Sequence, residues 1–219
     1  LDAIRLFLKQ RLPFNSATTR ERCAHYVIRR MFPDGVADQG FLHFARAYAG
    51  QRAWREACFY RFCKAEPQMY EVIEDFIRPA LGVGQMPRNA VRKHLEQRFP
   101  GMPSTKHAAL AVVEALVSGG LAKANRETLY VSYREPTLAG FAFVVQSEFP
   151  EPGMFNIVSL EQNRALRAML WQPTSLLSML YELRNKQIIS AISEIDALRQ
   201  FTTRYSFEQV CEILAQTRM

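Results

Sequence analysis

Apolar residues recur every three or four positions through the first eighty residues, which is the spacing of helices that bury one face. Turn signals, such as Pro33 to Gly35 and Gly50, separate the helical stretches. The pattern predicts four helices, at about residues 18–31, 41–49, 52–64 and 66–77. Thr18 or Thr19 is expected to cap the first of them. We therefore expect residues 1–80 to form a helical bundle.

A different pattern begins after residue 80. Two short helices are predicted at 86–99 and 104–118, and alternating apolar and polar residues from Leu129 to Arg134 then predict a strand after a polar turn. Helix, helix and β-ribbon in this order are typical of a winged helix-turn-helix. Residues 81–136 are therefore predicted to form a winged-helix-like module.

The second of these helices has its own expected features. Ser104 or Thr105 is expected to cap it after Pro103, and Gly119–Gly120 to end it. Its apolar residues from Ala108 to Val117 are nearly continuous. We therefore expect it to be buried beyond its first turn, which would leave very few residues able to contact bases.

The last third repeats this order more loosely, so residues 137–219 are predicted to be a second, mainly helical winged-helix-like module. The apolar run from Phe141 to Val145 fits a buried strand or the start of a helix, and periodicity does not decide between them. Residues 149–153 are expected to form a linker or turn, and helices are expected at 160–171 and 176–185. Pro173 to Ser175 is expected to cap the second of these helices, and a last helix is expected from Ser206. The predicted fold class is mostly α.

Charge adds a partner class to this picture. The 219 residues contain 28 Lys and Arg against 21 Asp and Glu, a net charge of +7 and a pI near 9.4. Residues 1–64 hold 12 basic and 5 acidic side chains, and residues 81–135 hold 8 and 4. Residues 65–80 hold 1 basic and 4 acidic side chains, and residues 136–219 hold 7 basic and 8 acidic side chains. Such clustering of basic residues favours an anionic partner such as duplex DNA.

The candidate DNA-binding residues lie in the two basic segments. They are Arg20, Arg22, Arg29, Arg30, Arg88, Arg92, Lys93, Lys106, His107, Lys123 and Arg126. Those of the bundle are expected to contact phosphates from a helix flank, because Arg suits bidentate phosphate contacts. Lys106 and His107 open the second helix of the winged unit, where the free N–H groups of a helix attract anions. Lys123 and Arg126 take the position of the wing.

Motifs of enzymes and of metal sites are absent from the sequence. There is no phosphate-binding loop, no GxSxG elbow and no HExxH pair, and the four histidines are dispersed. The four cysteines form no CxxC pair, which is typical of reduced thiols in a cytosolic protein. The first residues are too charged for a secretory signal, and no apolar run reaches 18 residues. We expect no catalytic residues, metal, cofactor or membrane contact, and a cytoplasmic location.

One family shares this order of features across roughly residues 18–135. The matching pieces are TTRERCAHYVIRRMF, then FLHF, then ACFYRFCKAEPQMYEVIEDFI, and after a short basic helix STKHAALAVVEALVSGGL and LYVSY. In this order the chain resembles the BrxA family of BREX phage-defence systems. The resemblance implies a helical bundle similar to the NusB fold, small winged modules, and DNA binding without a catalytic site. It also implies a cytoplasmic bacterial accessory subunit that works beside a methyltransferase and an ATPase.

The predicted function is thus a non-enzymatic, DNA-binding accessory subunit of a phage-defence complex, whose partners are duplex DNA and other subunits. Two alternatives remain open. A winged-helix adaptor would dock proteins through its acidic helix from Glu66 to Asp75 and its neutral last third. A transcription regulator would bind a defined operator as a homo-oligomer. Sequence does not separate DNA from RNA.

Overall fold

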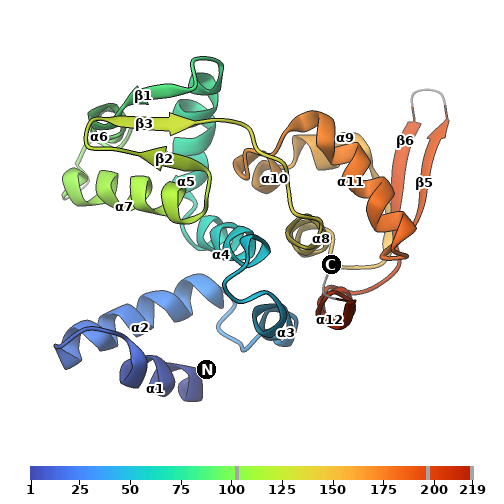
Figure 1. Ribbon diagram of the computed structural model, residues 1–219, viewed down its shortest axis with the longest axis horizontal. Coiled ribbons are helices and arrows are strands. Elements are labelled where there is room, and N and C mark those ends of the chain that lie inside the picture. The colour runs from blue at the N-terminus through green and yellow to red at the C-terminus, as the bar shows by residue number, and fades with distance from the viewer. Residues whose placement is uncertain (102–103, 196–197, 218–219) are drawn as a thin grey trace.

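The computed structural model describes residues 1–101, 104–195 and 198–217. It is mostly helical, as expected, with two small antiparallel sheets of three strands each (Figure 1). The N-terminal helices are α1 (Asp2–Arg11), α2 (Ala17–Met31), α3 (Gln39–Tyr48), α4 (Arg52–Ala65) and α5 (Gln68–Val72). A π-helical turn η1 (Ile73–Ile77) and a 3-10 turn η2 (Arg78–Gly82) continue α5.

Polar caps set the starts of the first helices. The Ser16 hydroxyl accepts a hydrogen bond from the Thr19 N–H at 3.4 Å, so Ser16 caps α2 and the expected cap at Thr18 or Thr19 is wrong. Asp38 caps α3 by accepting from the Phe41 N–H at 3.0 Å. The helices therefore begin one or two residues before the apolar pattern does, because a cap precedes the first buried residue.

The first module follows η2, and we use that name for its sheet and two helices. In chain order these are β1 (Gln85–Pro87), α6 (Arg88–Arg98), α7 (Thr105–Ser118), β2 (Ala122–Ala124) and β3 (Thr128–Val131). β3 lies in the middle of the sheet, with Met86 opposite Leu129 on one side and Lys123 opposite Tyr130 on the other. Gly119 and Gly120 end α7, as expected, and Gly120 has a φ of +74°.

A second module has a similar order of elements, with three helices in place of two between its first and second strands. After α8 (Leu138–Glu148) come β4 (Gly153–Asn156), α9 (Ile157–Gln162), α10 (Arg164–Ala168), α11 (Pro173–Asn185), β5 (Ile189–Ile195) and β6 (Leu198–Thr203). Here too the last strand is central, in the order β4-β6-β5, which matches β1-β3-β2 of the first module. The last helix is α12 (Phe207–Thr217), and Ser206 and Gln209 bond reciprocally at its start.

Several expectations for this last third need correction. The undecided run from Phe141 to Val145 is helical, and α8 is buried on all sides from Ala139 to Gln146, which is why it shows no helical period. The expected turn at 149–153 leads into β4 at Gly153. The helix expected from 160 to 171 is interrupted at Asn163, whose side chain caps α10 by accepting from the Ala165 and Leu166 N–H groups. Pro173 is the first residue of α11, and no side chain caps that helix.

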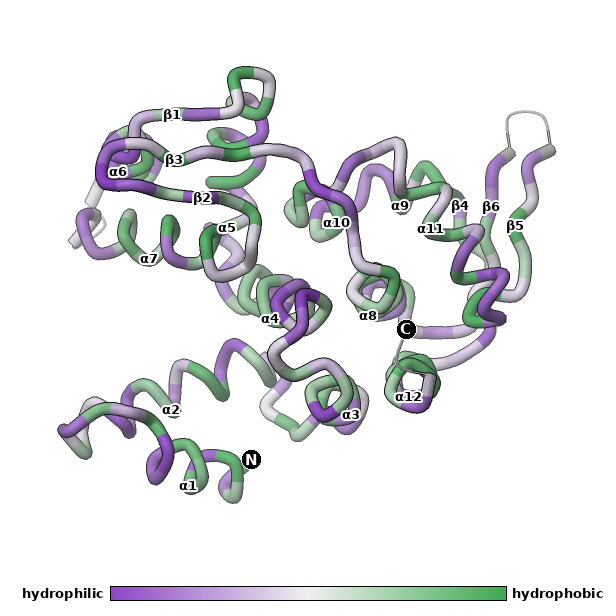
Figure 2. Tube along the Cα trace, viewed as in Figure 1, coloured by the Kyte–Doolittle hydropathy of each residue, from purple (hydrophilic) through white to green (hydrophobic). Residues whose placement is uncertain are grey.

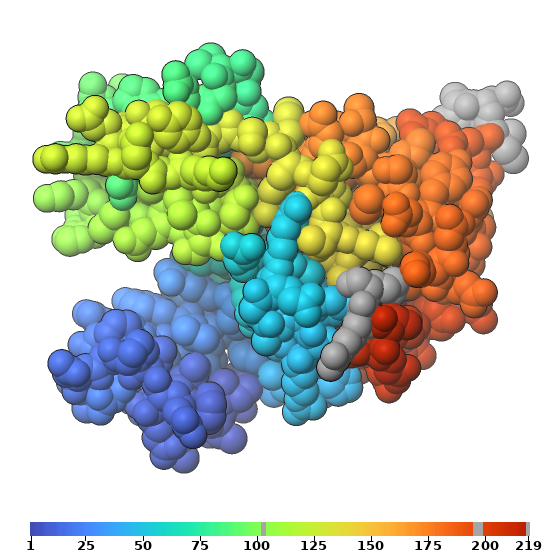
Figure 3. All heavy atoms as spheres, viewed as in Figure 1, coloured from blue at the N-terminus to red at the C-terminus, as the bar shows by residue number. Residues whose placement is uncertain are grey.

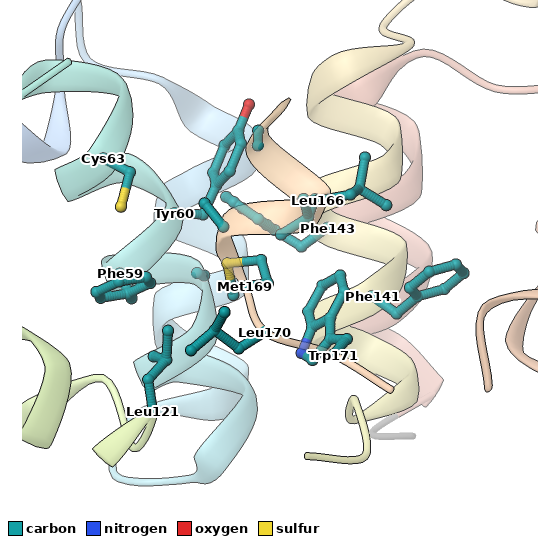
Figure 4. Packing of buried hydrophobic residues seen from close by; sticks show 14 of the residues in the cluster. Phe59, Tyr60, Cys63, Leu121, Phe141, Phe143, Leu166, Met169, Leu170 and Trp171 are labelled. Atoms are coloured by element: carbon teal, nitrogen blue, oxygen red, sulfur yellow. The ribbon is translucent and has the colours of Figure 1, made fainter. Parts of the chain in front are cut away.

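The core is shared between the N-terminal helices and the last third of the chain. The Phe143 ring of α8 lies 4.7 Å from that of Phe44 and 5.2 Å from that of Phe207. Gly40 allows α12 to approach α3, because a Cβ there would lie 2.8 Å from the Phe207 ring. Figure 4 shows side chains of α4, of α8 and of residues 166–171 facing one another in this core. Tertiary contacts thus cross the predicted boundary at residue 136.

A buried ion pair joins the bundle to both modules. Glu56 of α4 is fully buried and accepts hydrogen bonds from the N–H and hydroxyl of Thr137, at 3.2 and 2.5 Å. The Arg134 guanidinium lies 3.7 Å from Glu56 and donates to the carbonyls of Gly119 and Met169. Burial lowers the pKa of Arg134 to about 10, so it stays charged at neutral pH. This contact fixes the ends of α7 and α10 against α4.

Candidate nucleic-acid interface

A groove of about 670 Å³ lies at one end of the first module, between the first turns of α6 and α7 and the β2–β3 turn. It brings together four of the residues predicted to bind DNA. They are Arg88, Lys106, His107 and Arg126. These four residues come from three separate stretches of sequence. The short strand β1 places the start of α6 beside the start of α7 and the β2–β3 turn. Figure 2 shows the hydrophilic stretch of the β2–β3 turn at this tip of the molecule.

Backbone contacts fix the position of Arg88. It is the first residue of α6, its N–H donates to the Glu127 carbonyl at 2.7 Å, and its guanidinium donates to the Asn125 carbonyl at 3.3 Å. Asn125 in turn accepts from the N–H groups of Glu127 and Thr128, at 2.9 and 2.7 Å. The turn that carries Arg126 is therefore tied to the start of α6. Sequence reasoning missed Asn125, although an Asn before a turn is a recognised turn signal.

Lys106 and His107 lie in the first turn of α7, and both are exposed. Among the described residues, neither Lys106 nor Arg126 has an ion-pair partner, and Glu127 is the one acidic residue lining this groove. Ser104 occupies the cap position with a φ of +65° and makes no side-chain cap bond, and Pro103 lies outside the described residues. The groove is therefore a cationic concavity at a helix start, which suits a phosphate group.

The rest of α7 differs from the expectation that it is buried beyond its first turn. Ala109, Val113 and Leu116 are buried and Ala108, Val112 and Ala115 are partly buried against the core, while Leu110 is 44% and Val117 is 40% exposed. The prediction was wrong because a single sheet and α6 cover just one side of the helix. The exposed side is apolar or acidic, with Glu114 in its middle. Only the first turn is cationic.

The other predicted residues of this module lie outside the groove. Lys123 is exposed on β2, in the same hairpin as Arg126. Arg92 and Lys93 are exposed on α6, and Arg92 is paired with Glu96 at 2.7 Å. Lys93 has no ion-pair partner among the residues that the structure describes.

The four arginines predicted on the bundle are not part of this groove. Arg29 and Arg30 both pair with Glu66, the second at 3.0 Å. Arg20 donates to the carbonyls of Phe14 and Asn15, at 2.5 and 3.1 Å, and so fastens the α1–α2 connection. Arg22 is exposed, and within the described ranges it has no ion-pair partner. Partners within the chain already compete with phosphate for three of these four side chains.

Other titratable groups serve the structure. Arg98 pairs with Glu71 at 3.1 Å and Arg164 pairs with Glu74 at 2.9 Å, so the acidic helix holds its neighbours. Burial lowers the pKa of His94, whose ring stacks on Phe76 at 4.7 Å. All four cysteines are free, and burial raises the pKa of Cys58 to about 12. Within residues 1–101, 104–195 and 198–217, no group of three or more His, Cys, Asp or Glu side chains could hold a metal ion.

Comparisons with known proteins add no relative. The chain matches no protein-family model, and no curated protein or solved structure is significantly similar to it. The resemblance to the BrxA family therefore stays a prediction. In the part of the chain that the structure describes, no helix has the length and apolar character needed to span a membrane.

Proposed function

We propose that this protein is a non-enzymatic DNA-binding subunit that holds duplex DNA mainly through its phosphates. The observation that carries the proposal is the convergence of Arg88, Lys106, His107 and Arg126 on one groove. None of these four side chains has an ion-pair partner among the described residues, so their charge is available to a ligand. Each phosphate that they neutralise releases counterions, and these gains add along a backbone.

The arrangement of elements supports a winged helix-turn-helix for the first module. A three-stranded sheet in the order β1-β3-β2 with two helices between its first and second strands fits that fold. In this interpretation α7 is the recognition helix and the β2–β3 turn is the wing. The second module, with the order β4-β6-β5, is proposed to be a winged helix as well.

The chemistry of α7 favours weak sequence preference. Past His107 its exposed side offers Leu110 and Ala111, which give a base edge no hydrogen bond, and Glu114, whose carboxylate repels phosphate. Base contacts are limited to the first turn, and backbone contacts carry the affinity. We therefore propose general duplex binding rather than recognition of a defined operator.

The biological setting follows from the sequence resemblance alone. We propose a cytoplasmic accessory subunit of a BREX-like phage-defence system, which binds DNA beside other subunits of the complex. The exposed apolar residues Leu110 and Val117 of α7 favour a second role, as an adaptor that docks proteins.

A titration of fluorescent duplex DNA at about 50 and 200 mM salt tests the proposal. Four to six phosphate contacts predict an affinity loss of roughly 10²–10³ between the two salt concentrations. No binding at the lower salt concentration, or equal affinity at both, would refute the proposal. A single-stranded DNA and a duplex RNA of the same sequence separate duplex DNA from the other nucleic acids.

A further inference from the structure

A second groove, of about 490 Å³, lies between the bundle and the first module. Its walls come from α2, α4 and α7, and in Figure 3 a recess separates the blue lobe of α1 and α2 from the green lobe of the first module. The lining is mainly apolar, with Val27, Met31, Trp54 and Phe62 among its residues. It shares no residue with the cationic groove.

The spacing of the lining residues points to a helical ligand. On α2 the lining residues are Cys23, Tyr26, Val27, Arg30 and Met31, a stripe two turns long. The stripes on α4, from Trp54 to Phe62, and on α7, from Ala111 to Gly119, have the same length. Eight residues of helix span roughly 12 Å, so the groove accommodates two to three turns of a partner helix.

Apart from Glu114, the α7 wall is made of small residues. It presents Ala111, Ala115, Ser118 and Gly119 to the groove. Small side chains let the backbone of a second helix approach closely, as they do wherever helices pack tightly. The opposite walls supply the large side chains Tyr26 and Phe62. The groove therefore has a shallow side for backbone and a deep apolar side for anchoring side chains.

The charges on the rim of the groove favour one sign of charge on the partner helix. Arg30 and Arg55 stand on the α2 and α4 sides, and Glu114 stands on the α7 side. Arg30 shares Glu66 with Arg29, whereas Arg55 is exposed and has no ion-pair partner among the described residues. The net positive rim complements an acidic helix.

The same charges argue against a second copy of α1 as the ligand. That helix is amphipathic and leaves Leu6 and Phe7 more than half exposed. It also carries Arg5, Lys9 and Arg11 against one acidic residue, Asp2. Its charge has the same sign as the rim.

We propose that this groove docks an acidic amphipathic helix of another protein. The apolar side chains of that helix enter between α2 and α4, and its carboxylates lie over Arg55. The proposal goes beyond DNA binding and does not depend on it.

Three synthetic helical peptides test the proposal by fluorescence anisotropy with the full chain. They share one apolar face of Leu and Phe at i, i+4 and i+7, and their flanking positions are all Glu, all Gln or all Lys. We expect the Glu peptide to bind about tenfold more tightly than the Lys peptide at low salt. Equal binding of all three, or no binding of the Glu peptide, would overturn the proposal.

Variants locate the binding. Ala111 is exposed, so Ala111→Trp fills the groove without entering the core, and it should abolish binding of the Glu peptide. Arg55→Glu should remove the preference for the Glu peptide over the Lys peptide. Arg46→Glu makes the same charge change on α3, away from the groove, and should keep that preference. An effect of Arg46→Glu as large as that of Arg55→Glu, or unchanged binding in Ala111→Trp, would contradict the assignment.

Protection of a groove cysteine reports where the peptide binds, and DNA affinity reports whether the same groove contacts nucleic acid. Cys23 lines the groove, so the Glu peptide should slow its reaction with a thiol reagent several-fold in wild type and in Arg46→Glu. Circular dichroism checks that Ala111→Trp folds. Duplex DNA affinity should be unchanged in Ala111→Trp, and a large loss there would make the groove part of the nucleic-acid interface instead.

Discussion

The two modules share the strand order of their sheets, although the second has three helices where the first has two, and their surfaces differ in charge. Residues 81–136 hold 8 basic and 4 acidic side chains, whereas residues 137–219 hold 7 and 8. In the first module the first turn of α7 presents Lys106 and His107. The matching turn of α11 presents Thr174 and Ser175, and the Ser175 hydroxyl donates to Glu135 at 2.5 Å.

The hairpins differ in the same way. Arg126 in the β2–β3 turn has no acidic partner among the described residues, whereas Arg199 of β6 pairs with Glu194 at 3.4 Å and with Glu161 at 3.7 Å. The second module also shares its core with the bundle through α8 and α12. One topology thus supports two uses, a charged surface in the first module and a structural support in the second. Fold alone therefore does not assign the DNA contact.

The largest expected effect concerns the contact that holds both modules to α4. Glu56→Ala leaves the Arg134 side chain, 12% exposed, without its countercharge. We expect the free energy of unfolding to fall by about 3–5 kcal/mol in chemical denaturation. Glu114→Ala is the control, because Glu114 is exposed, and it should stay within about 0.5 kcal/mol of wild type. A small effect of Glu56→Ala would show that the modules are held elsewhere.

A smaller loss of stability is expected from a substitution in the last third of the chain, at Glu148. Glu148 at the end of α8 is half-buried, which alone would raise its pKa, but hydrogen bonds from Tyr60 and Asn163 and the charge of Lys64 lower the pKa below its ordinary 4.5. Its contribution to stability is complete above pH 4.5 and is lost as the pH falls through the folded-state pKa. Glu148→Gln should cost about 1.5–3 kcal/mol at pH 7 and flatten the acid dependence.

That comparison is made by denaturant titrations of both proteins at pH 7 and at about pH 3. The gap between wild type and Glu148→Gln should narrow at the lower pH. A gap that is independent of pH would mean that Glu148 contributes through shape rather than charge.

The smallest change in stability is expected at the surface of the first module. Arg126→Ala should leave the free energy of unfolding within about 0.5 kcal/mol of wild type. It should nevertheless reduce the slope of log affinity against log salt by about one unit, because one phosphate contact is lost. Loss of stability without a change of slope would place Arg126 in the fold and not in the DNA contact.

Much of the helical part was predictable, because helices with one buried face show their period in sequence. The start of α12 at Ser206 and the end of α7 at Gly119 follow from local signals that need no tertiary contact. β1 was not predictable, because three residues with one buried side chain, Met86, carry no period. α8 was undecided because it is apolar on every side.

The candidate site was predictable only as a set of residues. Charge clustering singled out Lys106 and Arg126, but it did not separate them from Arg29 and Arg30. The difference lies in Glu66, which is 36 residues from Arg30 in sequence and next to it in the fold. The prediction that α7 is buried beyond its first turn was wrong for a related reason. An apolar stretch of sequence does not reveal how many sides of the helix are covered.

The central claim is that the first module, and not the second, carries the DNA contact. Lys106→Glu with Arg126→Glu should weaken duplex DNA binding at least tenfold at low salt and reduce the salt slope by about two units. The matched control is Lys186→Glu with Arg204→Glu, the same charge change at two exposed positions of the last third. It should retain most of the affinity and the full slope. Equal losses in the two double variants, with both proteins folded by circular dichroism, would contradict the claim.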